Sequence, residues 1–259
     1  MAGYTLPHDL KGEQQRLALM SALLDPLERA HFDRLGVKSG WRCLELGAGN
    51  GSIARILAGI VAPSGHVVAS DIDVRCMADL KGEGLEVRRL DITADAIEDE
   101  AYDLVVARAL LHHLPGRRSA LKRMVEAVKP GGVILSIEPD MLPCTAAEPA
   151  SMGTFWRRWL KWSEQSGIDY FVGRRIPGWL DSLGMEGVSA EGHTAHFNGG
   201  SDWATYWTST IRELAPSLQK SGNVTQKMLE EFYSLYEDPH YWTSVITFIA
   251  TSGRKPAII

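Results

Sequence analysis

Short apolar runs alternate with segments of helical spacing through the first half of the chain. Trp41 to Leu46 and Val67 to Ser70 are apolar runs of strand length, and Ile53 to Val61 between them has the spacing of a helix. The same order continues with two further predicted strands, a helix and a fifth strand, at Leu85 to Leu90, Tyr102 to Ala107, Arg118 to Val128 and Val133 to Ile137. This alternation favours an α/β fold, in which a doubly wound and mostly parallel sheet is covered by helices on both faces.

The pattern changes on both sides of this segment. Glu13 to Leu35 has apolar residues at a helical spacing that is interrupted near Pro26, which predicts two short helices before the sheet. Beyond Glu138 the chain becomes mainly helical, with helices predicted at Ala147 to Ser166, Pro177 to Leu183 and Ser201 to Tyr236, and strands near Val188 to Phe197 and at Val245 to Ser252. We expect these additional helices to form a lid on the sheet rather than an independent domain.

Composition and charge disfavour several classes of function. The 259 residues carry a formal net charge of −5, which provides no basic field for a phosphate backbone, so nucleic acid is not an expected substrate. Three cysteines without a CxxC pair fit a reducing compartment and argue against a thiolate zinc site. We find neither a leader sequence nor an apolar run of the roughly 18 to 20 residues that a membrane span needs. A cytoplasmic protein without membrane contact is therefore expected.

A glycine-rich turn follows the first predicted strand. Glu45 stands near the end of that strand, and Gly47, Gly49 and Gly51 lead into the next helix. Glycine allows positive φ here and removes side chains that would hold a ligand away, while the helix N-terminus favours a carboxylate or phosphate. Asp71 ends the second strand, where its carboxylate can accept hydrogen bonds from both hydroxyls of a ribose. The turn and Asp71 together indicate a cofactor that contains a nucleoside.

Two details discriminate between cofactors. The dinucleotide fingerprint would place Gly or Ala where this chain has Ser52, which weakens the case for a nicotinamide cofactor. Asp91 follows the third strand, and its carboxylate could accept from the exocyclic amine of adenine while Ile92 packs on the ring. Acids at three successive strand ends thus outline an adenosine.

Taken together, several segments resemble the class I S-adenosylmethionine-dependent methyltransferases. They are Glu45, Asp71, Asp91, residues 103–106, residues 110–115 and the turn Lys129, Pro130, Gly131, Gly132. The two flanking stretches are similar to a bacterial small-molecule, natural-product type subgroup of that superfamily. The residues that carry this second similarity are Tyr4, Leu6, His8, Glu13 and Arg16, and then Asp238, Pro239, Tyr241, Trp242, Gly253, Arg254, Lys255 and Pro256.

The resemblance implies a Rossmann-like sheet of seven strands with the last strand antiparallel. It divides the chain into N-terminal lid helices over 1–35, a cofactor-binding core over 36–140, and helical lid insertions with the last two strands over 141–259. S-adenosylmethionine is the implied cofactor, and the residues implied to bind it are Tyr4, Arg16, Glu45, Gly47, Gly49, Gly51, Asp71, Ile72, Asp91, Ile92 and, through its backbone, Arg108. Arg16 could instead be a surface charge of its helix.

Two adjacent histidines follow the fourth strand, close to the expected position of the methyl group. If the backbone is extended there, the two side chains point in opposite directions and one of them faces the substrate. We favour His112, whose neutral imidazole could accept a proton from the acceptor near neutral pH, although it could also merely shape the pocket. His113 is then expected to cap or pack beneath the following helix.

Other polar residues give weaker signals. Glu138 and Asp140 follow the fifth strand and could orient a substrate, or could be solvated or cap a turn. His193 and His196 would point to opposite faces of a strand, so we expect no metal site.

Aromatic residues concentrate in the second half of the chain, because seven of the eight tryptophans follow Asp140. Most are expected in the core of the lid, and some should line a pocket for a flat substrate. We therefore predict an enzyme that moves a methyl group from S-adenosylmethionine to oxygen, nitrogen or carbon of a small, aromatic or polycyclic metabolite. Two alternatives stay open, a cofactor-binding protein that promotes a cyclisation without methyl transfer and a nicotinamide-dependent oxidoreductase. The acceptor atom and the oligomeric state are not predicted.

Overall fold

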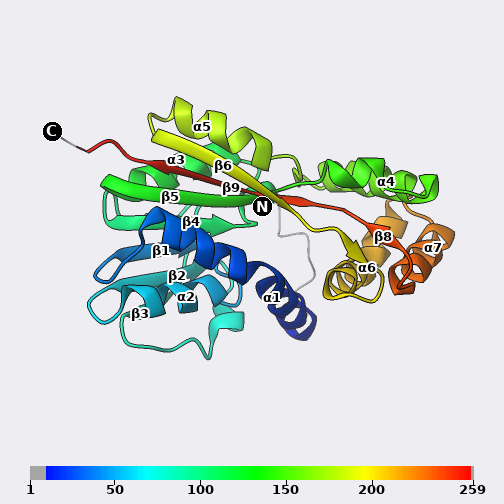
Figure 1. Ribbon diagram of the computed structural model, residues 1–259, viewed down its shortest axis with the longest axis horizontal. Coiled ribbons are helices and arrows are strands. Elements are labelled where there is room, and N and C mark those ends of the chain that lie inside the picture. The colour runs from blue at the N-terminus through cyan, green and yellow to red at the C-terminus, as the bar shows by residue number, and fades with distance from the viewer. Residues whose placement is uncertain (1–9, 258–259) are drawn as a thin grey trace.

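A sheet of seven strands forms the centre of the computed structural model, which describes residues 10–257 (Figure 1). The strand order is β3-β2-β1-β4-β5-β9-β6. Strands β1 to β5 are parallel, and β9 pairs antiparallel with both β5 and β6. The strands are β1 Arg42–Leu46, β2 His66–Asp71, β3 Leu85–Arg89, β4 Tyr102–Arg108, β5 Val128–Asp140, β6 Glu186–Thr194 and β9 Thr247–Arg254. The predicted α/β fold, a mostly parallel seven-stranded sheet whose last strand is antiparallel, is confirmed.

Helices cover both faces of the sheet because successive strand residues point to opposite sides. In β4, Leu104 and Val106 join one apolar cluster, whereas Val105 and Ala107 join a second one. The first cluster is covered by α1 Leu10–Leu35 and α2 Ser52–Val61, and the second by α3 Arg117–Ala127 and α5 Ile176–Ser182. Burial on both sides explains why these strands are nearly continuous apolar runs.

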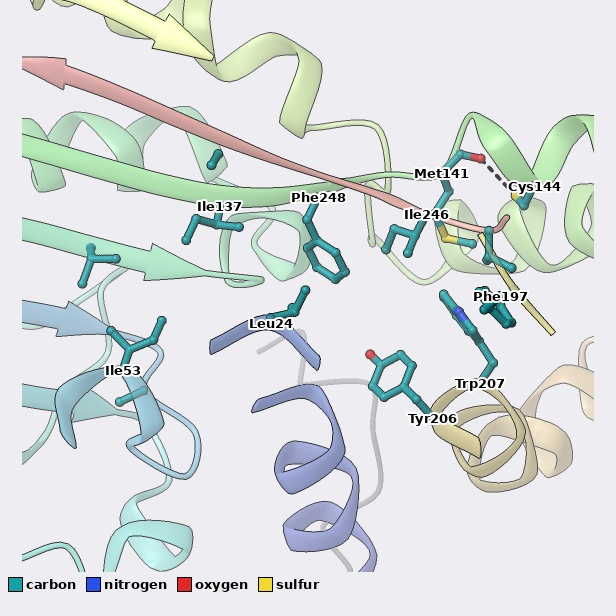
Figure 2. Close-up of a cluster of buried hydrophobic side chains, with 14 of the residues drawn as sticks. Leu24, Ile53, Ile137, Met141, Cys144, Phe197, Tyr206, Trp207, Ile246 and Phe248 are labelled. Carbon is teal, nitrogen blue, oxygen red and sulfur yellow. Dashed lines mark hydrogen bonds between the residues drawn. The ribbon is translucent and has the colours of Figure 1, made fainter. Parts of the chain in front are cut away.

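A mainly helical unit lies beyond the carboxyl ends of the strands (Figure 1). It contains α4 Ala150–Gln165, α6 Asp202–Lys220, α7 Gln226–Glu237 and a short antiparallel sheet of two strands, β7 Phe197–Asn198 and β8 Trp242–Thr243. Figure 2 shows that apolar side chains run without interruption from Ile137 of the sheet through Phe248 to Trp207 of α6. Trp156 and Trp159 are fully buried in this unit, so they are core residues of it.

Short turns and breaks refine the predicted elements. Single turns of 3-10 helix lie at Val74–Met77, Leu111–His113, Pro143–Ala146 and Gly173–Arg175. The predicted helix from Ser201 to Tyr236 is two helices, because Thr225 caps a new N-terminus by accepting from the backbone N–H of Met228. No helix among residues 10–257 has the length and apolar character that crossing a membrane would take.

The N-terminal segment differs from its prediction, since α1 is one helix with Pro26 in its interior rather than two short helices. Proline removes a backbone hydrogen bond and bends a helix, but it does not end this one. Leu24 before Pro26 and Phe32 after it are both buried in the same apolar cluster. Burial of both halves against one face of the sheet outweighs the local cost of the proline.

Replacement of Pro26 tests this account. Pro26→Ala restores a backbone donor inside α1, and we expect a net gain of about 1 to 2 kcal/mol in the free energy of unfolding, since the unfolded chain also becomes more flexible. Chemical denaturation measures the change. A loss of stability would show instead that the bend is required to bring α1 onto the sheet.

Candidate active site

A cavity of about 660 Å³ opens at the carboxyl ends of β1, β2 and β4, between α1 and α6. It brings together most of the residues that the sequence indicated. Those that line it are Arg16, Gly47, Gly49, Asp71, Ile72, Asp91, Ile92, Arg108 and His112. Glu45 and Gly51 do not line it, and Tyr4 lies outside the described residues.

The glycine turn approaches the cavity at two positions. Gly47 and Gly49 have φ of 69° and 56°, in the left-handed region where side chains are strained. A Cβ on Gly47 would lie 2.9 Å from Leu110 Cδ1, and one on Gly49 would lie 3.1 Å from Leu17 Cδ2. Side chains at these positions would therefore crowd the cavity wall as well as strain the backbone.

Gly51 and Glu45 act behind the cavity wall. Gly51 has φ of 71°, and a Cβ there would lie 2.4 Å from Leu80 Cδ2, so the backbone conformation and the packing behind the wall both favour glycine. Glu45 is buried, and its Oε2 has no hydrogen-bond partner among the described residues. Burial raises the pKa of Glu45 to about 8 in spite of the nearby Arg108 guanidinium.

Two acids and two isoleucines define the end of the cavity nearest β2 and β3. Asp71 accepts hydrogen bonds from the backbone N–H of Gly49 at 2.9 Å and of Asp73 at 3.0 Å, which fixes its carboxylate. Asp91 accepts from the backbone and hydroxyl of Thr93, and these bonds lower its pKa. Ile72 is 47% exposed although it is large and apolar, and Ile92 also lines this part of the cavity. Carboxylates beside apolar surfaces are suited to the sugar and flat base of a nucleoside.

Arg108 connects the end of β4 to two helices. Its guanidinium lies 2.9 Å from Asp25 Oδ1 and 3.3 Å from Glu28 Oε2, both on α1, and it donates to Ser52 Oγ of α2 at 3.1 Å. Ser52 in turn donates to Asp25 at 3.0 Å. The serine that departs from the dinucleotide fingerprint is therefore part of a buried ionic network. Burial raises the pKa of Glu28 to about 7.

Arg16 reaches the cavity from the first half of α1. It is 7% exposed, and its guanidinium forms a bidentate pair with Glu13, with N–O distances of 3.0 Å and 2.7 Å. The pair is partly covered and lines the cavity. Arg16 is therefore not a solvated surface charge of its helix.

His112 is held by a buried carboxylate. Glu138 at the end of β5 accepts hydrogen bonds from the backbone N–H groups of Leu110, Leu111 and His112, and its Oε2 lies 3.1 Å from His112 Nδ1. Burial lowers the pKa of His112 to about 3 and raises that of Glu138 to about 7. The imidazole is therefore neutral at physiological pH, and its Nε2 makes no hydrogen bond to any described residue.

The backbone around the two histidines corrects the sequence interpretation. Leu111–His113 is a 3-10 turn rather than an extended segment, and it follows Ala109, which has φ of 53°. Both histidine rings consequently line the cavity, with their centroids 3.8 Å apart. The expectation that the two side chains point in opposite directions is wrong, because that rule holds for strands.

The other polar candidates lie away from the cavity. Asp140 forms a bidentate pair with Arg174 and accepts from the backbone N–H of Leu142. His193 belongs to β6, and His196 stacks on Trp242 with ring centroids 5.6 Å apart. Within residues 10–257, no three His, Cys, Asp or Glu side chains are arranged to hold a metal ion.

An aromatic surface forms the part of the cavity nearest α6. The residues that line it are Pro139, Tyr170, Tyr206, Trp207, Thr210, Ile246 and Phe248. Sequence reasoning placed aromatic residues in the lid but did not identify these positions. Their spacing in the chain carries no common signal, because β5, the segment after α4, α6 and β9 each contribute a part.

Comparison with known proteins agrees with this geometry. Residues 44–134 match a family of methyltransferase domains. A ubiquinone/menaquinone biosynthesis C-methyltransferase from Ectopseudomonas mendocina is 32% identical over 119 residues, which are 43% of this chain and 46% of that relative. The chain thus spans less than half the length of that relative.

Solved structures extend the similarity to most of the fold. A phosphoethanolamine N-methyltransferase from Haemonchus contortus has a TM-score of 0.57 at 18% identity, covering 93% of this chain and 52% of the nematode chain. The [4+2]-cyclase SpnF has a TM-score of 0.56 at 15% identity, covering 90% of this chain and 81% of that one. The glycine turn, the sheet topology and the matched residues 44–134 identify a methyltransferase domain in this chain. This match disfavours the nicotinamide-dependent alternative.

The buried carboxyl of Glu45 should make stability depend on pH. Its pKa is raised to about 8 in the folded protein, compared with about 4.3 in an unfolded chain, so its contribution to stability is present at low pH and is lost as the pH rises through 8. The Glu45→Gln variant has an amide in place of the carboxyl, and this amide does not titrate. Thermal unfolding at about pH 5.5 and about pH 8.5 should therefore differ less for E45Q than for the wild type.

The control is Glu86→Gln, which changes an exposed carboxyl. An equal fall in stability for E45Q and the wild type would show that Glu45 is ionised in the folded protein.

Proposed function

We propose that this protein transfers the methyl group of S-adenosylmethionine to a small, uncharged aromatic or polycyclic acceptor. The observation that carries the proposal is the two-part cavity, which joins an end lined by carboxylates and isoleucines at β2 and β3 to an aromatic surface at α6. His112 lies at the end of β4, and its ring centroid is 5.1 Å from that of Tyr170 on the aromatic side.

The cofactor end fits S-adenosylmethionine on several grounds. Asp71 presents a fixed carboxylate to the ribose hydroxyls, and the half-exposed Ile72 with Ile92 offers apolar surfaces to the two faces of an adenine. Gly47 and Gly49 leave room for the methionine moiety, and Arg16 supplies a guanidinium for its carboxylate. When bound, the cofactor supplies a methyl group on a positively charged sulfur.

The protein contributes alignment and the exclusion of water. Methyl transfer is an in-line displacement, so the acceptor atom must be held about 3 Å from the methyl carbon. α1 and α6 face each other across the cavity, and Leu17 and Met20 of α1 lie over the cofactor end. We assign these two helices the role of a lid that opens for exchange of cofactor and closes for transfer.

His112 is placed to remove the proton of an acceptor hydroxyl or activated carbon. When Glu138 is ionised, it accepts the hydrogen of Nδ1, and the lone pair of Nε2 is free to accept a proton. When Glu138 is protonated, it donates to Nδ1, so the imidazole hydrogen moves to Nε2 and the base is lost. The low pKa of His112 itself means that the neutral ring persists to well below neutrality.

Binding of S-adenosylhomocysteine tests the cofactor assignment. Asp71→Ala removes the carboxylate offered to two ribose hydroxyls, each such bond contributing about 1.5 to 3 kcal/mol, so we expect the dissociation constant to rise at least tenfold. Titration calorimetry measures it, with the exposed Asp99→Ala as the control. Unchanged affinity would remove Asp71 from the site.

The pH dependence of transfer tests the role of His112 and Glu138. The acceptor can be 2-naphthol, with the gain of one methyl group detected by mass spectrometry. The wild-type rate should fall below about pH 7 as Glu138 becomes protonated. We expect His112→Ala to lower the rate by about 10²- to 10⁴-fold without weakening cofactor binding.

Glu138→Gln separates this mechanism from simple support of the turn. The amide oxygen can replace Oε1 toward Leu110 and Leu111. The amide nitrogen then lies beside Nδ1, where it fixes the inactive tautomer, and the backbone N–H of His112 is the one turn donor that loses its acceptor. E138Q should therefore be slow at every pH and lack the decline near pH 7. A rate in His112→Ala that equals the wild type would make His112 a wall of the pocket. Binding of cofactor and aromatic molecules without any methylated product would favour the cyclisation alternative.

A further inference from the structure

The aromatic surface at α6 carries no formal charge. None of its seven lining residues, named above, is ionised at neutral pH, and they come from four separate segments of the chain. A phosphate, carboxylate or ammonium group bound against it would lose its hydration without gaining a partner. A ligand of this surface is therefore flat and neutral in the part that it covers.

Tyr206 provides this surface with an unused hydrogen-bonding group. The hydroxyl of nearby Thr210 already donates to the backbone carbonyl of Tyr206 at 2.8 Å, and the indole nitrogen of Trp207 is enclosed by neighbouring side chains. Tyr206 is 9% exposed, and its hydroxyl makes no hydrogen bond to a described residue. In Figure 2 its ring leaves α6 toward Leu24 and Phe248, with the hydroxyl at the tip.

We propose that Tyr206 determines which acceptors are selected, by hydrogen bonding to an oxygen of the acceptor at a point away from the methylated atom. The inference rests on the proposed function and adds a second polar contact to it. The acceptor thus carries two polar atoms on an apolar ring body, one near His112 and one near Tyr206. Phosphoethanolamine, which is small and charged throughout, does not satisfy this pattern.

A matched pair of probes tests the proposal by binding alone. 2-Acetylnaphthalene and 2-ethylnaphthalene have the same ring body and nearly the same shape, and they differ by a carbonyl oxygen. With S-adenosylhomocysteine saturating, the wild-type protein should bind the acetyl probe about 3- to 10-fold more tightly than the ethyl probe. Tyr206→Phe removes the hydroxyl and should bind the two probes about equally.

The control variant is Tyr233→Phe on α7, which removes a hydroxyl outside the cavity and should keep the wild-type preference. Equal preference in the wild type and Tyr206→Phe would overturn the role of Tyr206 and leave the proposed function intact. Failure of both probes to bind a wild-type protein that binds S-adenosylhomocysteine would overturn the aromatic acceptor and, with it, this inference.

Discussion

The arrangement of the site depends on a buried cation that faces more carboxyl groups than it can neutralise. Arg108 lies among Asp25, Glu28 and Glu45, and burial raises the pKa of Glu28 to about 7 and that of Glu45 to about 8. The remaining pair of Arg108 and Asp25 attaches α1 to the end of β4, and Ser52 attaches the same pair to α2. Removing one partner of a buried ion pair costs about 3 to 5 kcal/mol, because the other charge is left unpaired. The part of α1 that carries Asp25 and Glu28 is thus fixed electrostatically as well as by apolar contacts.

A second buried carboxyl organises the opposite wall of the cavity. The carboxyl of Glu138 accepts hydrogen bonds from three backbone N–H groups of the turn after β4, and it is also hydrogen-bonded to Nδ1 of His112. Such a turn would otherwise leave several donors unsatisfied in the protein interior. The same contacts that shape the turn also set the orientation of His112, so structure and chemistry cannot be separated by removing Glu138 completely. This is the reason that an isosteric change is more informative here than a truncation.

Sequence patterns predicted the parts of the molecule that are determined locally. β1 to β5 are apolar runs bounded by turn residues, and Asp71 and Asp91 stand at strand ends that any parallel sheet brings to one edge. α1 continues through Pro26 because Leu24 and Phe32 are both buried in one apolar cluster. The presence of a proline in the sequence does not reveal this tertiary burial. The 3-10 turn at Leu111–His113 depends on a carboxyl 27 residues away from Leu111, so a local extended conformation was the wrong assumption. The aromatic surface forms only where four segments of the chain meet, and the sequence of any one segment does not predict that meeting.

The place of β9 in the sheet has a consequence for the order in which the chain can fold. β6 is translated more than fifty residues before β9, yet its described ladder is made with β9 alone. During synthesis, β1 to β5 can therefore assemble before β6 has a strand to pair with. The backbone hydrogen-bonding groups at the outer edge of β5 stay unpaired until β9 is added. Because β9 carries Phe248, the same insertion that closes the sheet also completes the aromatic wall. A nascent chain at that stage would have the residues of the proposed cofactor side, but only part of those on the proposed acceptor side.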